Sequence, residues 1–522
     1  MKDEAETGLA ARHPRAFLAM VVFVFLSAFL VRVYRINEAP RDFWTVRQYS
    51  GALIARALFF ENNSAIPEWR RDVVSGYMKW LAEPPVLEVA SAAVFRLIGS
   101  EQFWVPRTIT VTCWMLGGVL LFAAVRRLLS REAALAAAVF YLFLPYAMAA
   151  SRSWQPDSLM VAGLCGCLLT GLKYFERPSA RRLALYAAVS AATTFVKPGG
   201  SLLMMFGLFA GLSLYHRGFW SSVKAPSSWV YAVASVLPSG VIVLWARAQG
   251  WYQPGWHFQT YLSFHLLRTL YFWKGWLGVL VHVFTWPGLV VACSGFLFLR
   301  DRRTLAVVLG YGGGYVIQSL LFSFTTPNHD YWHLLAVPLL GLGAAGLVVP
   351  SEKVTEGRRA GIQSVIVWVL CLAWMIAGVN AVSWGSRGSD NGAYVQMART
   401  IGDAVGHSRR VVFLDYDVGN SLKYFAEIDG WYWPESDLMA HHHLGYGKRA
   451  APETRPELLA ADRFEEFYAT NHPDYFVICR AMQELDRQPG LRDFLFSNYP
   501  VMTNGGRFIV FDLRRKKTPD EP

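Results

Sequence analysis

The stretch AFLAMVVFVFLSAFLVRV, residues 16–33, is apolar except for Ser27 and Arg32 and is long enough to cross a membrane. Arg12 and Arg15 precede it, and it continues through Val33 into Arg-rich sequence. A secretory signal peptide would instead end at a short cleavage site of small residues. The run is therefore predicted to be a retained first transmembrane span.

Ten further runs of similar character follow along the chain. They lie near 107–125, 132–150, 156–172, 182–197, 199–215, 228–247, 276–299, 304–325, 331–350 and 361–384. The whole sequence of 522 residues is 54% hydrophobic and only 17% charged, whereas soluble domains carry about 25% charged residues. These features predict a mainly α, polytopic membrane protein with about eleven transmembrane helices.

The net charge of +12 could indicate a nucleic-acid partner. Most Lys and Arg residues, however, lie in short loops between apolar runs, which is typical of orientation in a membrane. We therefore predict contact with membrane lipids and no nucleic acid.

The run from Val86 to Gly99 is too short for a span and contains Glu88 and Arg96, so it predicts an interfacial or re-entrant helix. Five basic loops then fall on the same side as the N-terminus. The positive-inside rule makes that side cytoplasmic, in a plasma (inner) membrane. The outer loop 35–106 and everything after about residue 385 are then extracytoplasmic.

The chain after the last run has the pattern of a small soluble α/β domain. Strand candidates are 411–415, 475–479 and 508–511, and amphipathic stretches are 419–427, 462–470 and 483–497. We predict a transmembrane domain at 1–384, with short juxtamembrane helices in its outer loop, and an extracytoplasmic domain at 385–522.

Polar segments that could carry chemistry all meet the extracytoplasmic face in this topology. They are 39–49, 79–85, 103–107, 151–157, 196–200 and 327–333. Ionisable residues at a membrane edge are costly and tend to be functional. Arg and Lys bind phosphate, and a carboxylate can act as general base toward a hydroxyl. The combination suits a site for a phosphate-linked lipid.

The motifs in these segments follow a recognisable order. They are Arg47-Gln48, Glu83-Pro84-Pro85, Pro106-Arg107, Ser151-Arg152 with Pro156-Asp157, Val196-Lys197 and His329-Asp330-Tyr331-Trp332. In order and placement the chain resembles, over essentially its whole length, the GT-C superfamily of membrane glycosyltransferases. The branch it resembles most includes protein O-mannosyltransferases and the lipid A aminoarabinose transferase.

The resemblance implies transfer of a hexose or pentose from a polyprenyl-phosphate donor to a lipid, glycan or protein acceptor outside the cytoplasm. It implies that a first-loop carboxylate is the base, but here Arg47-Gln48 is followed by Tyr49-Ser50 rather than closely by Asp. The base is thus Asp42 or Glu83, and Asp157 matches the second acidic position of the superfamily. The expected substrate-binding residues are Arg47, Gln48, Lys79, Arg107, Arg152, Lys197, His329 and Asp330.

Structural roles compete with four of these assignments, whereas a lone Lys197 on the less basic side needs a partner. Asp42 could form a turn beside Pro40, Glu83 could pair with Lys79, and Asp157 could only stabilise the start of a helix. Arg152 could extend its charged end to the interface.

Metal binding by His329 and His333, or by the run 441–443, is a weaker hypothesis, because no third ligand accompanies the first pair and such a run is more often a solvated loop. We predict no metal ligand; the cofactor stays open, since the sequence requires none and a divalent cation is compatible with it.

Two other functions are compatible with so apolar a chain. A transporter or flippase of a lipid-linked glycan would usually show repeats and polar residues near the bilayer middle. A polysaccharide polymerase or ligase would tend to place its large outer loop late in the chain. Here the polar residues gather at one face and the large loop directly follows the first span, so the glycosyltransferase is favoured.

Overall fold

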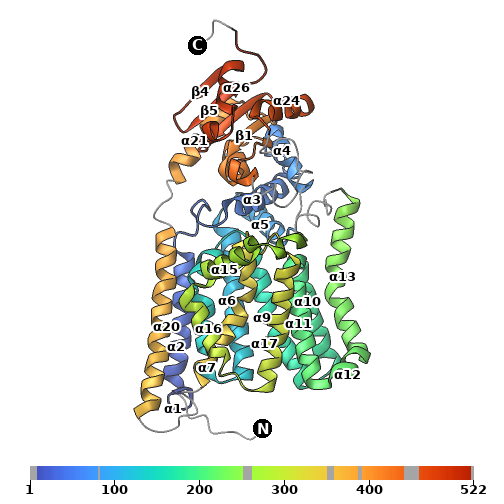
Figure 1. The fold of residues 1–522 in the computed structure, drawn as a ribbon, viewed down its shortest axis with the longest axis vertical. Helices are drawn as coiled ribbons and strands as arrows, with labels where there is room; N and C mark the ends of the chain where they lie inside the picture. Colours follow the sequence, from blue (N-terminus) through green and yellow to red (C-terminus); the bar gives the residue numbers. More distant parts are fainter. Residues whose placement is uncertain are drawn as a thin grey trace.

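In the computed structural model, the structure describes residues 9–79, 83–250, 262–349, 358–385, 391–439 and 458–518. A bundle of helices forms one half of the molecule, and a smaller α/β domain stands at its other end (Figure 1). The first outer loop lies between them, and its helices α3 (Thr45–Phe60) and α5 (Val86–Ile98) are seen there. The loop and the tail domain are thus on the same side of the bundle.

All eleven apolar runs are helical in the described residues. The bundle contains α2 (Pro14–Val33), α6 (Trp104–Leu128), α7 (Arg131–Phe143), α8 (Pro145–Ala150), α9 (Asp157–Glu176), α10 (Ala180–Val196), α11 (Pro198–Arg217), α13 (Pro226–Ala248), α15 (Leu270–Phe284), α16 (Trp286–Phe296), α17 (Arg302–Leu321), α18 (Val337–Gly346) and α20 (Arg358–Gly385). Short helices α1 (Leu9–Arg12), α12 (Phe219–Lys224), η2 (Phe264–Arg268) and η3 (Asp330–Ala336) join or extend them. The prediction of a polytopic, mainly helical membrane protein is confirmed.

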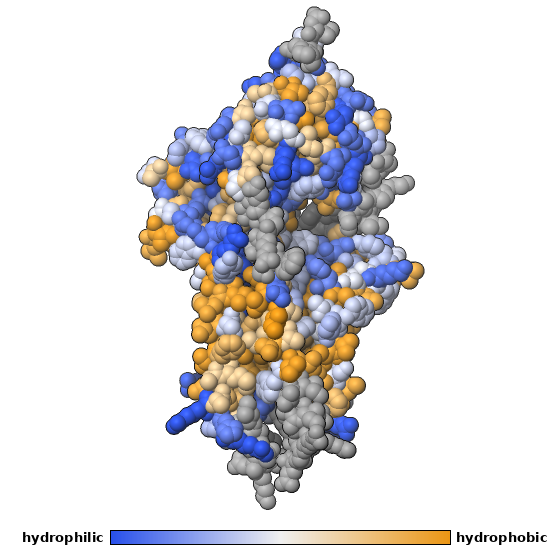
Figure 2. All heavy atoms as spheres, turned by 90° about the vertical axis from the view of Figure 1, so that its left-hand side faces the viewer, coloured by the Kyte–Doolittle hydropathy of each residue, from blue (hydrophilic) through white to orange (hydrophobic). Residues whose placement is uncertain are grey.

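Six of the described helices are each long and apolar enough to cross a membrane: α2, α6, α9, α11, α13 and α17. Large apolar side chains such as Phe23 on α2 and Leu237 on α13 are exposed. Figure 2 shows the resulting hydrophobic band across one face of the helical half, with hydrophilic residues gathered beyond both of its edges. This band is the surface that lipid tails would cover.

Two of the predicted runs differ in shape from a straight span. Helices α15 and α16 meet at an angle of 93°. The break is at Thr285, whose positive φ of 60° ends α15 and whose hydroxyl caps α16 at Gly288. Pro287 cannot continue the preceding helix, because its ring removes a backbone donor and clashes one turn back. The run at 132–150 is likewise divided before Pro145 into α7 and α8.

The short run in the first loop forms α5, a separate helix of 13 residues, rather than a span. The loop also contains α4 (Glu68–Val74) and η1 (Ser75–Lys79). A small residue lets α3 approach α5 closely, since a side chain at Gly51 would meet the Glu88 carboxylate at 2.8 Å. The first loop is therefore a packed helical layer on the bundle.

The tail domain is built on a five-stranded sheet in the order β2-β1-β3-β5-β4. The strands are β1 (Val411–Asp415), β2 (Gly430–Tyr432), β3 (Tyr475–Cys479), β4 (Val501–Asn504) and β5 (Phe508–Asp512). Strands β2 and β3 are parallel to β1, whereas β5 is antiparallel to β3 and to β4. The three predicted strands are confirmed as β1, β3 and β5.

Helices cover both faces of this sheet, which explains why its central strands are apolar throughout. Helices α24 (Ala460–Asn471) and α26 (Leu491–Asn498) pack on the face of Val412 and Phe476. Helices α21 (Asn391–Ala404) and α22 (Asn420–Ala426) pack on the face of Val411 and Val477. The short segments η4 (Tyr416–Gly419) and α25 (Glu484–Arg487) complete the domain.

The tail domain is fixed to the first loop through α22 and the residue that follows it. The Arg56 guanidinium donates to the Tyr424 carbonyl at 2.6 Å and pairs with Glu101 at 2.8 Å. Arg70 on α4 donates to Glu427 at 2.9 Å. Asn420 donates to the Val46 carbonyl at 3.0 Å, in the first turn of α3. The tail thus rests directly on the loop segment that contains Arg47.

Candidate active site

Four charged side chains from distant parts of the sequence meet where the first loop packs on the bundle. Lys197 Nζ lies 2.8 Å from Asp157 Oδ1 and 3.5 Å from Glu83 Oε1. The Arg47 guanidinium lies 3.2 Å from Glu83 Oε2 and 3.7 Å from Asp157 Oδ2. We call these residues, Arg47, Glu83, Asp157 and Lys197, the charge cluster.

Proline-marked helix ends place two members of the cluster. Asp157 is the first residue of α9 and follows Pro156, so its carboxylate lies at the positive end of the helix dipole. Lys197 stands between α10 and α11, where Pro198 starts the new helix and Lys197 has a non-helical backbone. The junction turns the lysine side chain out of both helices and towards Asp157.

The two pairs of the cluster differ in burial. The side chains of Asp157 and Lys197 are each 2% exposed, whereas those of Glu83 and Arg47 are 24% and 20% exposed. Two cations balance two carboxylates, which is what a largely dehydrated cluster requires. Asp157 with Lys197 forms the fixed inner pair, and Glu83 with Arg47 forms the outer pair that a ligand can reach.

An aromatic residue on η3 completes the site. The Tyr331 ring lies 4.3 Å from the Arg47 guanidinium carbon and 4.9 Å from Lys197 Nζ. Such cation–π contacts stabilise both cations. Burial alone would lower the pKa of Arg47, but Tyr331, Glu83 and Asp157 outweigh it and raise the pKa, so the guanidinium stays charged.

Asp42 belongs to a second group, held by arginines of the bundle. Its carboxylate lies 2.6 Å from the buried Arg107 and 3.8 Å from Arg152. Arg107 also donates to the backbone carbonyls of Ile36 and Glu38, at 3.2 and 3.0 Å. This network fixes the start of the first loop to α6.

Gln48 connects this second group with the turn before α9. Its amide nitrogen lies 3.5 Å from Asp42 and donates to the Phe43 carbonyl, and its oxygen accepts from the Trp154 backbone at 2.8 Å. Arg107 donates to the Arg152 carbonyl at 2.9 Å, and Arg152 donates to the Tyr34 carbonyl at 2.6 Å. The predicted residues Gln48, Arg107 and Arg152 thus lie beside the charge cluster, with their polar groups turned to the protein itself.

His329 and Asp330 form a third group, with Trp44. Trp44 donates its indole N–H to Asp330 at 2.5 Å, and its ring stacks on His329 with centroids 5.8 Å apart. His333 is engaged on both ring nitrogens, by the Tyr315 hydroxyl at 2.5 Å and the Thr326 carbonyl at 2.9 Å. No group of three or more His, Cys, Asp or Glu arranged for a metal occurs in the described part of the chain.

Other predictions fall on residues that the structure does not describe. Lys79 ends η1 but its side chain is outside the described residues, as are residues 441–443. The pairing of Glu83 with Lys79 therefore stays a prediction; among the described side chains, Glu83 contacts Arg47 and Lys197.

Two residues near the charge cluster were not among the site residues predicted from the sequence. Tyr331 entered the sequence analysis only as part of the motif at 329–332. Its aromatic ring, next to Asp330 at the start of η3, was the available signal for contact with a cation. Glu88 is 8% exposed on α5, and burial, together with the nearby Glu83 charge, raises its pKa to about 7. The position of Glu88 near the start of a largely apolar helix was the available signal.

Comparison with known proteins agrees with this architecture. The family model of dolichyl-phosphate-mannose-protein mannosyltransferase matches residues 82–245, a segment that contains Glu83, Asp157 and Lys197. ArnT from Cupriavidus metallidurans bound to undecaprenyl phosphate superposes with a TM-score of 0.57 at 15% identity, covering 96% of this chain and 98% of that one. No curated protein sequence matches the chain.

An archaeal structure has the same architecture. The oligosaccharyltransferase AglB from Archaeoglobus fulgidus, in complex with an inhibitory peptide and a dolichol-phosphate, superposes with a TM-score of 0.57 at 11% identity. The alignment covers 98% of this chain and 75% of that one. The chain has the GT-C fold. The resemblance inferred from the order of the motifs is confirmed at the level of the fold.

Proposed function

We infer that this GT-C protein is a glycosyltransferase that moves a sugar from a polyprenyl-phosphate donor to an acceptor hydroxyl, on the membrane face that bears the tail domain. The charge cluster carries this proposal: it combines two cations suited to a phosphate with two carboxylates, at the end of the bundle, in a fold shared with structures that bind undecaprenyl phosphate and dolichol-phosphate. The basic loops at the other end of the bundle favour a cytoplasmic N-terminus and an extracytoplasmic site.

The arrangement of the cluster suggests separate roles for its carboxylates. A donor phosphate approaching Arg47 and Lys197 would compete with Glu83, whose contacts of 3.2 and 3.5 Å are longer than the Asp157–Lys197 contact and whose side chain is more exposed than that of Asp157. Asp157 would keep Lys197 in place through the buried contact of 2.8 Å. Release of Glu83 from its cations would raise its basicity at the moment that the donor arrives.

The reaction then proceeds as a single displacement. The acceptor oxygen bonds to the anomeric carbon, the bond from that carbon to the phosphate oxygen breaks, and the acceptor proton passes to Glu83. Arg47 and Lys197 stabilise the charge on the departing polyprenyl phosphate. Asp42 remains the alternative base, but its carboxylate is taken up by Arg107 at 2.6 Å, which favours a role in fixing the loop.

The test is sugar transfer by the full-length purified protein from a panel of radiolabelled polyprenyl-phosphate sugars. Removing a general base lowers the rate by about 10²–10⁴-fold, so Glu83→Gln should lose that much while still binding unlabelled polyprenyl phosphate. Glu68→Gln is the matched control, since Glu68 is an exposed glutamate on α4 of the same loop.

Two results would contradict the proposal in different ways. Full activity in Glu83→Gln together with loss in Asp42→Asn would assign the base to Asp42. Absence of polyprenyl phosphate binding by the wild-type protein would remove the lipid-linked donor and with it the proposed reaction.

A further inference from the structure

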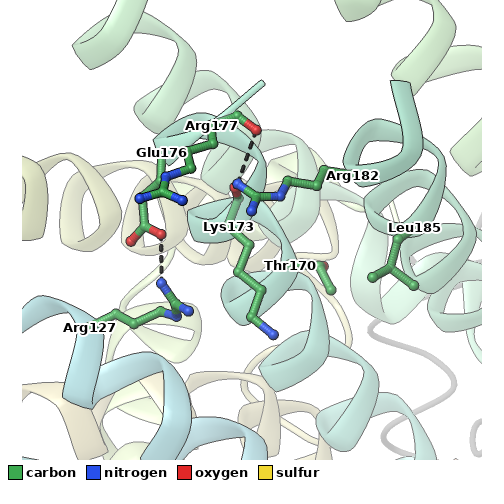
Figure 3. Close-up of a pocket in the computed structure, with 7 residues that line it drawn as sticks. All are labelled: Arg127, Thr170, Lys173, Glu176, Arg177, Arg182 and Leu185. Carbon is green, nitrogen blue, oxygen red and sulfur yellow. Dashed lines mark hydrogen bonds and ion pairs between the residues drawn. The ribbon is translucent and has the colours of Figure 1, made fainter. Parts of the chain in front are cut away.

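A second collection of charged residues lies at the other end of the bundle, away from the candidate active site. A cavity of about 490 Å³ opens there between α6, α9 and α10 (Figure 3). Its charged lining consists of Arg127, Lys173, Arg177 and Arg182, with Glu176 as its one carboxylate. We call it the basic pocket.

The basic pocket is separate from the charge cluster. Helix α9 begins with Asp157 in the cluster and contains Lys173 near its other end. Sixteen residues of α-helix correspond to about 24 Å along the axis. One phosphate group cannot contact both sites.

Hydrogen bonds connect the helices that line the basic pocket. Arg182 on α10 donates to the carbonyls of Lys173 and Arg177, at 3.0 and 3.1 Å, and so caps the end of α9. Arg127 on α6 donates to Glu176 at 2.6 Å. Figure 3 shows the bonds from Arg127 and from Arg182, which connect the three helices around the cavity.

The positive charge of the pocket is not balanced from within. Glu176 is already shared by Arg127, at 2.6 Å, and by Arg303 of α17, at 2.5 Å. Lys173 has no ion-pair partner among the described residues, and Figure 3 shows its side chain extending past Thr170 and away from Glu176. A positive cavity with an unpaired ammonium group is suited to an anion.

One wall of the pocket faces the lipid region. Leu185 on α10 lines the cavity and is 53% exposed. An anion that carries an acyl chain could therefore place its charge among the basic residues and its chain against this apolar wall. Basic pockets between helices at a membrane face bind acidic lipid head groups in this way.

We propose that the basic pocket binds a phosphate group, as the head group of an anionic phospholipid, with Lys173 as its principal contact. This site goes beyond the sugar-transfer function, because it lies on the opposite membrane face and uses none of the proposed catalytic residues. Bound lipid would join α6, α9 and α10 and so stabilise the bundle.

The experiment is the thermal stability of the detergent-solubilised full-length protein during titration with lipid. Phosphatidylglycerol tests the lipid-linked phosphate, phosphatidylcholine tests the acyl chains without net charge, and inorganic phosphate tests the free anion. The variant is Lys173→Gln, which breaks no ion pair with any residue in the described ranges. The control is Lys224→Gln, since Lys224 is an exposed lysine on α12 at the same end of the bundle.

We expect phosphatidylglycerol to raise the unfolding midpoint of the wild type, and phosphatidylcholine to have no comparable effect. The half-saturating phosphatidylglycerol concentration should rise about tenfold in Lys173→Gln, which corresponds to one charge-assisted contact, and stay unchanged in Lys224→Gln. Stabilisation by inorganic phosphate alone, with the same dependence on Lys173, would support a phosphate site but would show that its ligand is the free ion and not a lipid. Equal stabilisation of wild type and Lys173→Gln, or none by either phosphate source, would overturn the proposal.

Discussion

The charge cluster and the basic pocket lie near opposite ends of the same helix, α9, and handle charge in opposite ways. In the cluster, Lys197 and Arg47 are balanced by Glu83 and Asp157, and the inner pair is almost completely buried. In the pocket, four basic residues face one carboxylate, which is already shared. Charges that are removed from water need partners of opposite charge in the protein. Charges at a hydrated membrane edge are stabilised by water and can stay unpaired until a ligand binds.

From this difference we expect the largest effect on stability when a cation is removed from the charge cluster. Lys197→Met leaves Asp157 buried without its nearest partner, so the free energy of unfolding should fall by about 3–5 kcal/mol. The matched variant Lys173→Met, which removes a lysine with no ion pair among the described residues, should change it by less than about 0.5 kcal/mol. Chemical or thermal unfolding of both purified variants measures the difference.

A second substitution tests the cause of that effect. Adding Asp157→Asn to Lys197→Met removes the unpaired charge, so the double variant should recover part of the lost stability. A double variant as unstable as the sum of the two single variants would show that the pair is not energetically coupled.

The next effect concerns pH and Glu88, beside the cluster. Its folded pKa of about 7 lies above the ordinary glutamate value of 4.5, mainly because of burial. The folded state therefore retains a proton that the unfolded state loses, and stability should fall as pH rises from about 4.5 to 7, by up to about 3 kcal/mol.

Glu88→Gln isolates this contribution, because the amide is neutral at every pH. The stability of this variant, measured by unfolding between pH 5 and 8, should decline less over that window than the stability of the wild type. Parallel pH profiles for the two proteins would show that Glu88 titrates normally in the folded state.

These two regions also show what sequence patterns can predict. Hydropathy located the eleven apolar runs of the bundle, because the demand for about 20 apolar residues is imposed by the membrane and is local in sequence. It did not locate α3 in the first loop or α21 in the tail. The prolines at 145 and 287 indicate breaks in the helices. The bends were not predicted, because each apolar run continues through its proline and was interpreted as one span. In the tail, β1, β3 and β5 were predicted from buried apolar runs, whereas β2 and β4 are short edge strands whose pairing depends on their neighbours.

The site was predicted as a set of residues but not as a set of contacts. Glu83, Asp157 and Lys197 all follow or precede prolines at helix ends, which is a local signal. That Glu83 would meet Lys197, while Asp42 would meet Arg107, depends on the path of the first loop over the bundle. The basic pocket was missed altogether, because its lysine and arginines were interpreted only as residues that orient the chain in the membrane.

The smallest effect expected from the comparison is a difference in salt sensitivity. Salt at 0.5 M shortens the screening length to a few ångströms and weakens interactions of exposed charges more than buried ones. Raising the salt concentration from 0.05 to 0.5 M should therefore weaken phosphatidylglycerol stabilisation at the basic pocket by a few fold. Polyprenyl phosphate binding to wild type, which uses the buried Lys197, should change less. If both affinities fell by the same factor, the two sites would be equally exposed to solvent ions, and the contrast in burial would not extend to ligand binding.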